Sequence, residues 1–183
     1  MNTLKSLINL SFFLIVFGAT AQNMKEGFTY LETGKYAQAE SFFSTILADY
    51  PDNKTARLCY GRAVGLNGNS EKANTLFTSL LNDYPNDFEV KLNYGESLLW
   101  NSDFTAAKSY YKGLVTEDAT SFPALLGFAN TLSNLKEYED AIIYVDKALE
   151  VLPGNPNALT SKKYIYLGYA YQNQQAQNYT KAE

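Results

Sequence analysis

The chain of 183 residues contains no histidine and a single cysteine, Cys59. Histidine is the commonest general base and the commonest neutral metal ligand in proteins, so its absence removes both. Cys59 cannot form an internal disulfide and has no histidine to activate its thiol, and we interpret it as a packing residue. A calcium loop built from oxygen ligands is also excluded, because residues 67–70 hold too few carboxylates. We predict no catalytic residue, no metal site and no cofactor.

The charges do not gather into a basic stripe, and no glycine-rich loop opens a helix after a strand, as a phosphate-binding loop would. The chain has 15 Lys and Arg against 19 Asp and Glu, a net charge of −4, and its lysines are interleaved with acidic residues. A nucleic-acid-binding surface needs clustered positive charge to neutralise phosphates, and a membrane-surface helix needs the same. Nucleic acid and membrane surfaces are therefore not expected partners.

Long apolar runs are absent except near the N-terminus, where Lys5 precedes a mainly apolar stretch at residues 7–17, followed by Ala19-Thr20-Ala21. This pattern is typical of a secretory signal peptide cleaved before Gln22, because the run is shorter than the about 20 residues that span a membrane. No cysteine directly follows the run, so we do not expect a lipoprotein. We expect an exported chain, periplasmic or secreted, whose mature part does not insert into a membrane.

What the chain has in abundance is repetition, with a period of 34, the difference between positions 27 and 61. Four columns keep this period through four copies without an insertion. Two hold small residues (Gly27, Gly61, Gly95, Ala129 and Ala39, Ala73, Ala107, Ala141), and one holds aromatic or apolar residues (Phe43, Phe77, Tyr111, Val145). The fourth holds helix-breaking prolines (Pro51, Pro85, Pro153), with Ala119 in the place of proline in the third copy. A constant period of this length indicates a stacked array of one supersecondary unit. Such an array offers an extended recognition surface instead of a catalytic pocket.

Each copy is predicted to be a helical hairpin, as the second copy illustrates. Asn53 is a capping residue, and an apolar stripe at helical spacing runs from there to Asn67-Gly68-Asn69, where a glycine ends the first helix. A second amphipathic stretch follows from Ser70 to Tyr84. The small residues let the two backbones approach closely, and the apolar flank that remains is covered by the next hairpin.

The first copy carries the residues Gly27, Tyr30, Gly34, Tyr36, Ala39, Phe43 and Pro51, which resemble the consensus of the tetratricopeptide repeat family. The resemblance extends from Gln22 to Pro153. It implies an all-α fold, a right-handed α-solenoid of antiparallel helix pairs. We accordingly expect a signal peptide at 1–21, repeats at 22–53, 54–87, 88–121 and 122–155, and a C-terminal helix or partial fifth repeat at 156–183.

The tail differs from the four copies. Asn155-Pro156 is expected to cap a further helix whose Tyr164, Leu167, Gly168 and Tyr171 echo the repeat but lie several residues out of register. Residues 179–182 resemble the opening of a second helix. This half-started partner suggests that the natural polypeptide continues past Glu183.

In the family that the chain resembles, the first helix of each pair lines the concave side of the solenoid, which implies a groove that binds a protein or an extended peptide. On the expected groove stripe we place Phe28, Arg62, Asn93, Glu96, Trp100, Asn130 and Asn134. Trp100 is the only tryptophan, and it is either an exposed aromatic anchor of a binding hot spot or a core residue at the helix end. Arg62 is expected to face Glu96 across adjacent copies.

Three hypotheses of function follow. The first is an exported, non-enzymatic scaffold that holds a protein or peptide partner in its concave groove. The second is that the repeats form the periplasmic N-terminal arm of a larger envelope protein, such as an outer-membrane barrel involved in polysaccharide or protein export. The third, a hydrolase, is disfavoured because the composition offers only Cys59 as a thiol nucleophile and no histidine base. The sequence does not indicate an oligomeric state.

Overall fold

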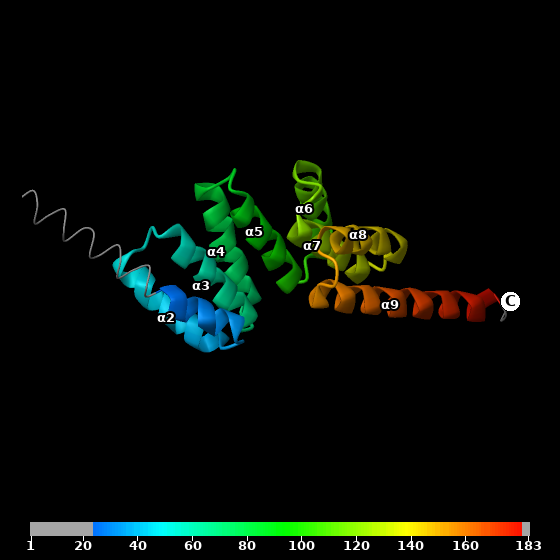
Figure 1. The fold of residues 1–183 in the computed structure, drawn as a ribbon, viewed down its shortest axis with the longest axis horizontal. Helices are drawn as coiled ribbons and strands as arrows, with labels where there is room; N and C mark the ends of the chain where they lie inside the picture. The colour runs from blue at the N-terminus through cyan, green and yellow to red at the C-terminus, as the bar shows by residue number, and fades with distance from the viewer. Residues whose placement is uncertain (1–23, 181–183) are drawn as a thin grey trace, which may run out of the picture. The chain divides into compact units, whose positions relative to one another are not determined.

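The computed structural model describes residues 24–180, and within this range it contains helices and turns but no strand. The predicted signal peptide, residues 1–21, lies outside the described residues. Residues 24–32 are helical, and the helices that follow are α2 (Tyr36–Asp49), α3 (Lys54–Leu66), α4 (Ser70–Asp83), α5 (Phe88–Trp100), α6 (Phe104–Glu117), α7 (Phe122–Asn134), α8 (Tyr138–Val151) and α9 (Pro156–Thr180) (Figure 1). The predicted all-α class is confirmed.

The helices repeat with the same period as the sequence. The first helices α3, α5, α7 and α9 begin at residues 54, 88, 122 and 156, and the second helices α2, α4, α6 and α8 begin at residues 36, 70, 104 and 138. Both series advance by one repeat at a time. In the tail, α9 itself starts in register, whereas its small residue is displaced as expected: Lys163 occupies the place that Ala129 has in α7, and Gly168 follows several residues later.

The starts of the first helices are fixed by capping side chains that each accept a hydrogen bond from a backbone N–H three residues later. Asn53 accepts from Ala56 at 3.0 Å, Asp87 from Val90 at 3.1 Å, and Asn155 from Ala158 at 3.1 Å. Each cap satisfies one of the amides that a helix start leaves without an intrahelical partner. The chain thus enters these first helices in the same way.

The turns inside the hairpins are fixed by one residue with a positive φ angle, which recurs with the period of the sequence. These residues are Gly34 (φ 73°), Gly68 (φ 98°), Ser102 (φ 59°) and Lys136 (φ 62°). The left-handed conformation ends the first helix and lets the second helix run back antiparallel to it. Glycine adopts it freely, whereas serine and lysine lose about 1 kcal/mol or more there.

The fifth member of this turn series is Ala170, and there the chain does not turn. α9 continues through it for a total of 25 residues, whereas α7 has 13. Alanine is the best helix former and disfavours positive φ, so the helix is the favoured local conformation at this position. The expectation of a second helix opening at Tyr179 is wrong for the described residues, because Tyr179 and Thr180 belong to α9.

The chain divides into two compact units, with the boundary inside α4 between Leu76 and Phe77. The first unit has a core in which Ala39 and Phe43 of α2 pack with Ala56 and Ala63 of α3. In the second unit the neighbouring helices α5 to α9 pack pairwise around one continuous core. This arrangement confirms the predicted α-solenoid of helix pairs. The handedness of the superhelix and the limits of the individual repeats stay predictions.

Tyr111 of α6 is the largest fully buried side chain of the second unit, 1% exposed. Its ring lies against two helical glycines: a β-carbon on Gly95 of α5 would be 2.9 Å from the ring, and a β-carbon on Gly127 of α7 would be 2.4 Å from it. Real β-carbons do not approach so closely. The two glycines therefore form the space that the ring fills, and the ring joins one hairpin to the next.

We predict that Gly127→Ala destabilises the protein by about 1 to 3 kcal/mol, because the added methyl group collides with the buried Tyr111 ring. The sign is informative, since Gly→Ala inside a helix normally stabilises by about 1 kcal/mol. Gly113→Ala in α6 is the matched control, because nothing lies within 4 Å of its β-position. Urea unfolding of both variants checks the prediction, and equal stabilisation by the two would contradict it.

Candidate functional site

The predicted groove residues of the second unit lie on its first helices. Glu96 of α5, Asn130 of α7 and Tyr164 of α9 stand at the same position of successive repeats, and α7 packs against both α5 and α9. We call the side of these three helices that carries Glu96, Asn130 and Tyr164 the first-helix face. The structure thus brings Glu96, Trp100, Asn130 and Asn134 onto two adjacent helices.

Asn93 lies beneath this face. Its side chain is 7% exposed, and its Nδ2 donates a hydrogen bond of 2.8 Å to the backbone carbonyl of Glu89, one turn earlier in α5. The amide is thus satisfied within its own helix, as buried polar groups generally are. Its place in the fold gives Asn93 a role in packing under the face.

Trp100 is half-buried at the end of α5, so it is neither a core residue nor fully exposed. Its ring centroid lies 6.2 Å from that of Phe77, which is completely buried, with the two rings inclined at 51°. This tilted contact holds one side of the indole and leaves part of the ring accessible. A preorganised aromatic ring of this kind is a suitable anchor for a ligand side chain.

The two asparagines of α7 differ in exposure. Asn130 is half-buried, whereas Asn134 is exposed and its Nδ2 donates a hydrogen bond of 2.8 Å to the backbone carbonyl of Asn130. This bond fixes the Asn134 side chain along the helix, while its amide oxygen still has the capacity to accept from a ligand. α7 therefore contributes a polar strip to the first-helix face.

Phe28 and Arg62 belong to the first unit. Phe28 is 37% exposed and its ring lies 6.2 Å from that of Phe43, and Arg62 is exposed on α3. They occupy the same repeat positions as Glu96 and Asn130 do in the second unit. The predicted pairing of Arg62 with Glu96 joins the two units and stays a prediction.

The candidate site that sequence reasoning missed is on α9. Tyr164 is 64% exposed, Leu167 56% and Tyr171 64%, and their spacing of three and then four residues places them on one side of the helix. Tyr164 stands one repeat after Asn130, so the signal was present in the sequence. Gly168, the small residue of this helix, places Tyr164 outside the groove column, whereas the start of α9 at Pro156 places it within that column.

The electrostatic environment of the face is set by Glu96 and the tyrosines behind it. Burial raises the pKa of Tyr111 far above its usual range, and the negative charge of Glu96 raises it further. Burial also raises the pKa of the neighbouring Tyr110 to about 12, with Tyr94 and Glu117 contributing. Both phenols therefore stay neutral at physiological pH, and Glu96 is the charged group of α5 on this face.

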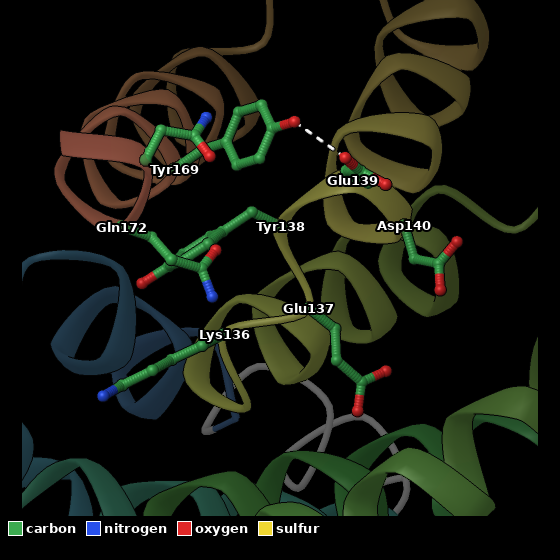
Figure 2. A pocket seen from close by; sticks show the side chains of 8 residues that line it. Lys136, Glu137, Tyr138, Glu139, Asp140, Tyr169 and Gln172 are labelled. Atoms are coloured by element: carbon green, nitrogen blue, oxygen red, sulfur yellow. Dashed lines mark hydrogen bonds between the residues drawn. The ribbon is translucent and has the colours of Figure 1, made fainter. Parts of the chain in front are cut away.

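A polar cavity of about 380 Å³ lies where α9 passes the start of α8 (Figure 2). It is lined by Lys136, Glu137, Tyr138, Glu139, Asp140, Tyr169, Gln172 and Asn173. Tyr169 reaches across from α9, and its hydroxyl donates a hydrogen bond of 2.7 Å to Glu139, as Figure 2 shows. Glu137 is engaged elsewhere, since it accepts a hydrogen bond of 2.7 Å from Lys108. The bond between Tyr169 and Glu139 holds α9 against α8.

Other chemical features are few in the described part of the chain. Cys59 is 7% exposed and forms no disulfide, which places it in the core of the first unit. Between residues 24 and 180, no three carboxylate or thiol side chains gather closely enough to hold a metal ion. In the same range no helix is both long enough and apolar enough to span a bilayer.

Comparisons with protein families match the chain twice. Residues 30–92 and residues 122–155 each match a family model described as tetratricopeptide repeat, and the two matches together cover just over half of the chain. A comparison with curated proteins by sequence found no match.

Solved structures with a similar fold include several repeat proteins. A thermophilic TPR protein in Thermus thermophilus superposes with a TM-score of 0.75 at 18% identity, over 88% of this chain and 89% of that chain. MamA of AMB-1 gives 0.57 at 17% identity, over 88% and 95%. A tetratricopeptide repeat protein from Parabacteroides merdae ATCC 43184 gives 0.59 at 17% identity, over 84% and 61%. At these identities the likeness shows the fold.

The neutral, buried Tyr111 predicts a loss of stability in alkali. Because its pKa is raised in the folded state, its contribution is complete below the unfolded value of about 10 and is lost as the pH rises above it. We expect this loss to approach about 1.4 kcal/mol for each pH unit above 10. Tyr111→Phe, which restores the ring type of Phe43 and Phe77, should flatten the decline in urea unfolding between about pH 9 and pH 12. An unchanged slope would show that other groups cause it.

Proposed function

Because the chain contains tetratricopeptide repeats, we propose that it is an exported, non-catalytic scaffold whose first-helix face binds a protein partner through an extended segment. The observation that carries the proposal is the exposed stripe Tyr164, Leu167 and Tyr171 on α9, each of which is more than half exposed. Isolated exposed apolar residues are ordinary, whereas a contiguous group of large ones marks an interaction surface.

The neighbouring helices supply the polar part of the surface. Asn130 of α7 and Glu96 of α5 stand at repeat spacing from Tyr164. Asn134 lies one turn further along α7. Trp100, one turn after Glu96 on α5, adds a half-buried aromatic ring to the same face. Tyrosine and tryptophan bring large contact areas at a small entropic cost, and asparagine offers both a donor and an acceptor to a peptide backbone. An extended segment lying across three helices would meet aromatic anchors at both ends and hydrogen-bonding groups between them.

The acidic group on this face bears on the choice of partner. Glu96 is half-buried and no lysine or arginine is among the residues of α5 and α7 that form the face, so a ligand carboxylate would meet repulsion there. The proposed partner segment is therefore neutral or basic where it crosses α5. The same face would serve if the repeats belong to a larger envelope protein.

Export is the second part of the proposal and rests on the N-terminal pattern of Lys5, an apolar run and Ala19-Thr20-Ala21. The destination is the periplasm or the outside of the cell. The single cysteine is compatible with an oxidising compartment, because it has no second cysteine with which to form an internal disulfide.

We predict that a photoreactive amino acid at position 164 or 134 crosslinks one and the same partner protein in the native envelope. Position 112 is the control, because Lys112 is exposed on the second helix α6, away from the first-helix face. With that partner purified, Tyr164→Ala should weaken binding by about 2 kcal/mol, or about thirtyfold. Tyr164 is a cleaner probe than Trp100, because Trp100→Ala also removes a packing contact with Phe77.

Crosslinking at position 112 with equal yield, or full affinity of the Tyr164→Ala protein, would overturn the assignment of the face. A circular dichroism spectrum identical to that of the parent protein is required of the variant, since Tyr164 is too exposed to support the fold.

We predict that the mature protein begins at Gln22. Expression of the full-length chain in a Gram-negative host, followed by intact mass measurement of the periplasmic fraction, should give a mass that lacks residues 1–21. Ala21→Arg should block cleavage, because signal peptidase requires a small residue directly before the cleaved bond. Recovery of the uncleaved chain in the cytoplasm would refute export.

A further inference from the structure

The polar cavity between α9 and the start of α8 is a second candidate site, separate from the first-helix face. Its volume of about 380 Å³ lies within the range of about 300 to 1,000 Å³ that is usual for small-molecule sites. The cavity forms because α9 runs straight past the start of α8. Gln172 and Asn173, which line it, follow Ala170, the position at which the earlier hairpins turn.

Three of the residues that line the cavity are not explained by the repeat. Residues that serve the packing of a solenoid recur from copy to copy. Glu139, Asp140 and Tyr169 stand where the preceding copy has Thr105, Ala106 and Leu135. Each therefore differs in charge or polarity from its counterpart. Beyond the bond that joins Tyr169 to Glu139, these polar groups are available for a role in the cavity.

Contacts between the lining residues hold several of them in place. The Tyr169 hydroxyl donates a hydrogen bond of 2.7 Å to Glu139, which raises the pKa of Tyr169, and Asn173 adds an opposing side-chain hydrogen bond (Figure 2). The Tyr138 ring lies 6.3 Å from the Tyr169 ring, inclined at 49°. It also contacts Gly168, where a β-carbon would be 2.6 Å from the ring. Two aromatic rings and their polar neighbours are thus ordered before a ligand arrives, which lowers the entropic cost of binding.

The chemistry of the lining restricts the kind of ligand. Among the described residues, the lining includes no aliphatic side chain, so an apolar molecule would leave polar groups without partners. The charges have both signs, because an anion would meet Glu139 and Asp140, whereas a strongly cationic ligand would meet Lys136. Glu137 is already neutralised by its bond to Lys108. The lining therefore suits a neutral ligand that has many hydrogen-bonding groups.

We propose that this cavity binds a neutral carbohydrate. A sugar has hydroxyl groups around its ring, each a donor and an acceptor, and C–H groups on its faces. The carboxylate of Asp140 and the amide of Gln172 each present two polar atoms in one plane, which two neighbouring hydroxyls can bind. The Tyr138 and Tyr169 rings offer aromatic surface to a C–H face. The proposal is independent of the first-helix face.

An array of neutral oligosaccharides built from glucose, galactose, mannose and N-acetylglucosamine tests the proposal. We expect the full chain to bind at least one of them, with a dissociation constant of about 1 mM or lower in calorimetric titration. Gln172→Ala should weaken this binding at least about fivefold by removing a hydrogen-bonding amide. Gln174→Ala is the matched control and should leave binding unchanged, because Gln174 is exposed on the same helix, outside the lining and about 200° further around.

Absence of binding to every neutral oligosaccharide, or equal weakening by the two variants, would overturn the proposal. The affinity should also stay constant between about 50 and 500 mM salt, because salt screens charged ligands and not neutral ones. Binding that is confined to sialylated or sulfated oligosaccharides, or that spermidine displaces, would assign a charged ligand and refute the neutral one. Tyr164 does not line the cavity, so none of these results affects the partner crosslinking at position 164.

Discussion

The contact between the Tyr111 ring and the two helical glycines that enclose it is the constraint on which the second unit depends. The ring contacts α5 through Gly95 and α7 through Gly127, and any side chain at either glycine would occupy the space of the ring. Helices whose axes lie about 8 to 10 Å apart have room for one large residue between two small ones, and the repeat uses that room fully. Because α5 and α7 are held in this way, their outward sides form one surface.

The repeat period of the sequence predicted those features of the fold that recur in every copy. The columns of small and large residues predicted the hairpins, the caps and the solenoid, because each is a local pattern that recurs in every copy. The period did not reveal Gly127, which stands outside the column of Gly27, Gly61 and Gly95. Glycine is needed at position 127 because of one neighbour, Tyr111. The hydroxyl group of Tyr111 makes this side chain longer than the phenylalanine at the same position of the first two copies. A contact between two copies is visible only when both side chains are seen together.

The candidate site shows the same limit. Spacing identified the helices that carry the face and the positions on them, so Glu96, Trp100, Asn130 and Asn134 are together on α5 and α7. Spacing did not separate Asn93, whose amide bonds to its own backbone, from residues that point outward. Nor did it decide the exposure of Trp100, which depends on the place of Phe77 in another helix. In the tail, the displaced Gly168 does not give the register of the helix, whereas the cap at Asn155 and the start at Pro156 do.

α9 differs from the other first helices in the backbone conformation of one residue, Ala170, which is helical where the earlier copies have a positive φ angle. At residues 34, 68, 102 and 136 the chain accepts a left-handed residue, and at two of these the residue is not glycine, so packing of the second helix must compensate for the local strain. At residue 170 the local preference of alanine for helix is stronger, and Tyr138 and Glu139 hold the straight helix from outside. A chain that folds back at this position covers one side of its first helix with the second helix, whereas α9 continues straight and leaves Leu159 and Tyr166 exposed.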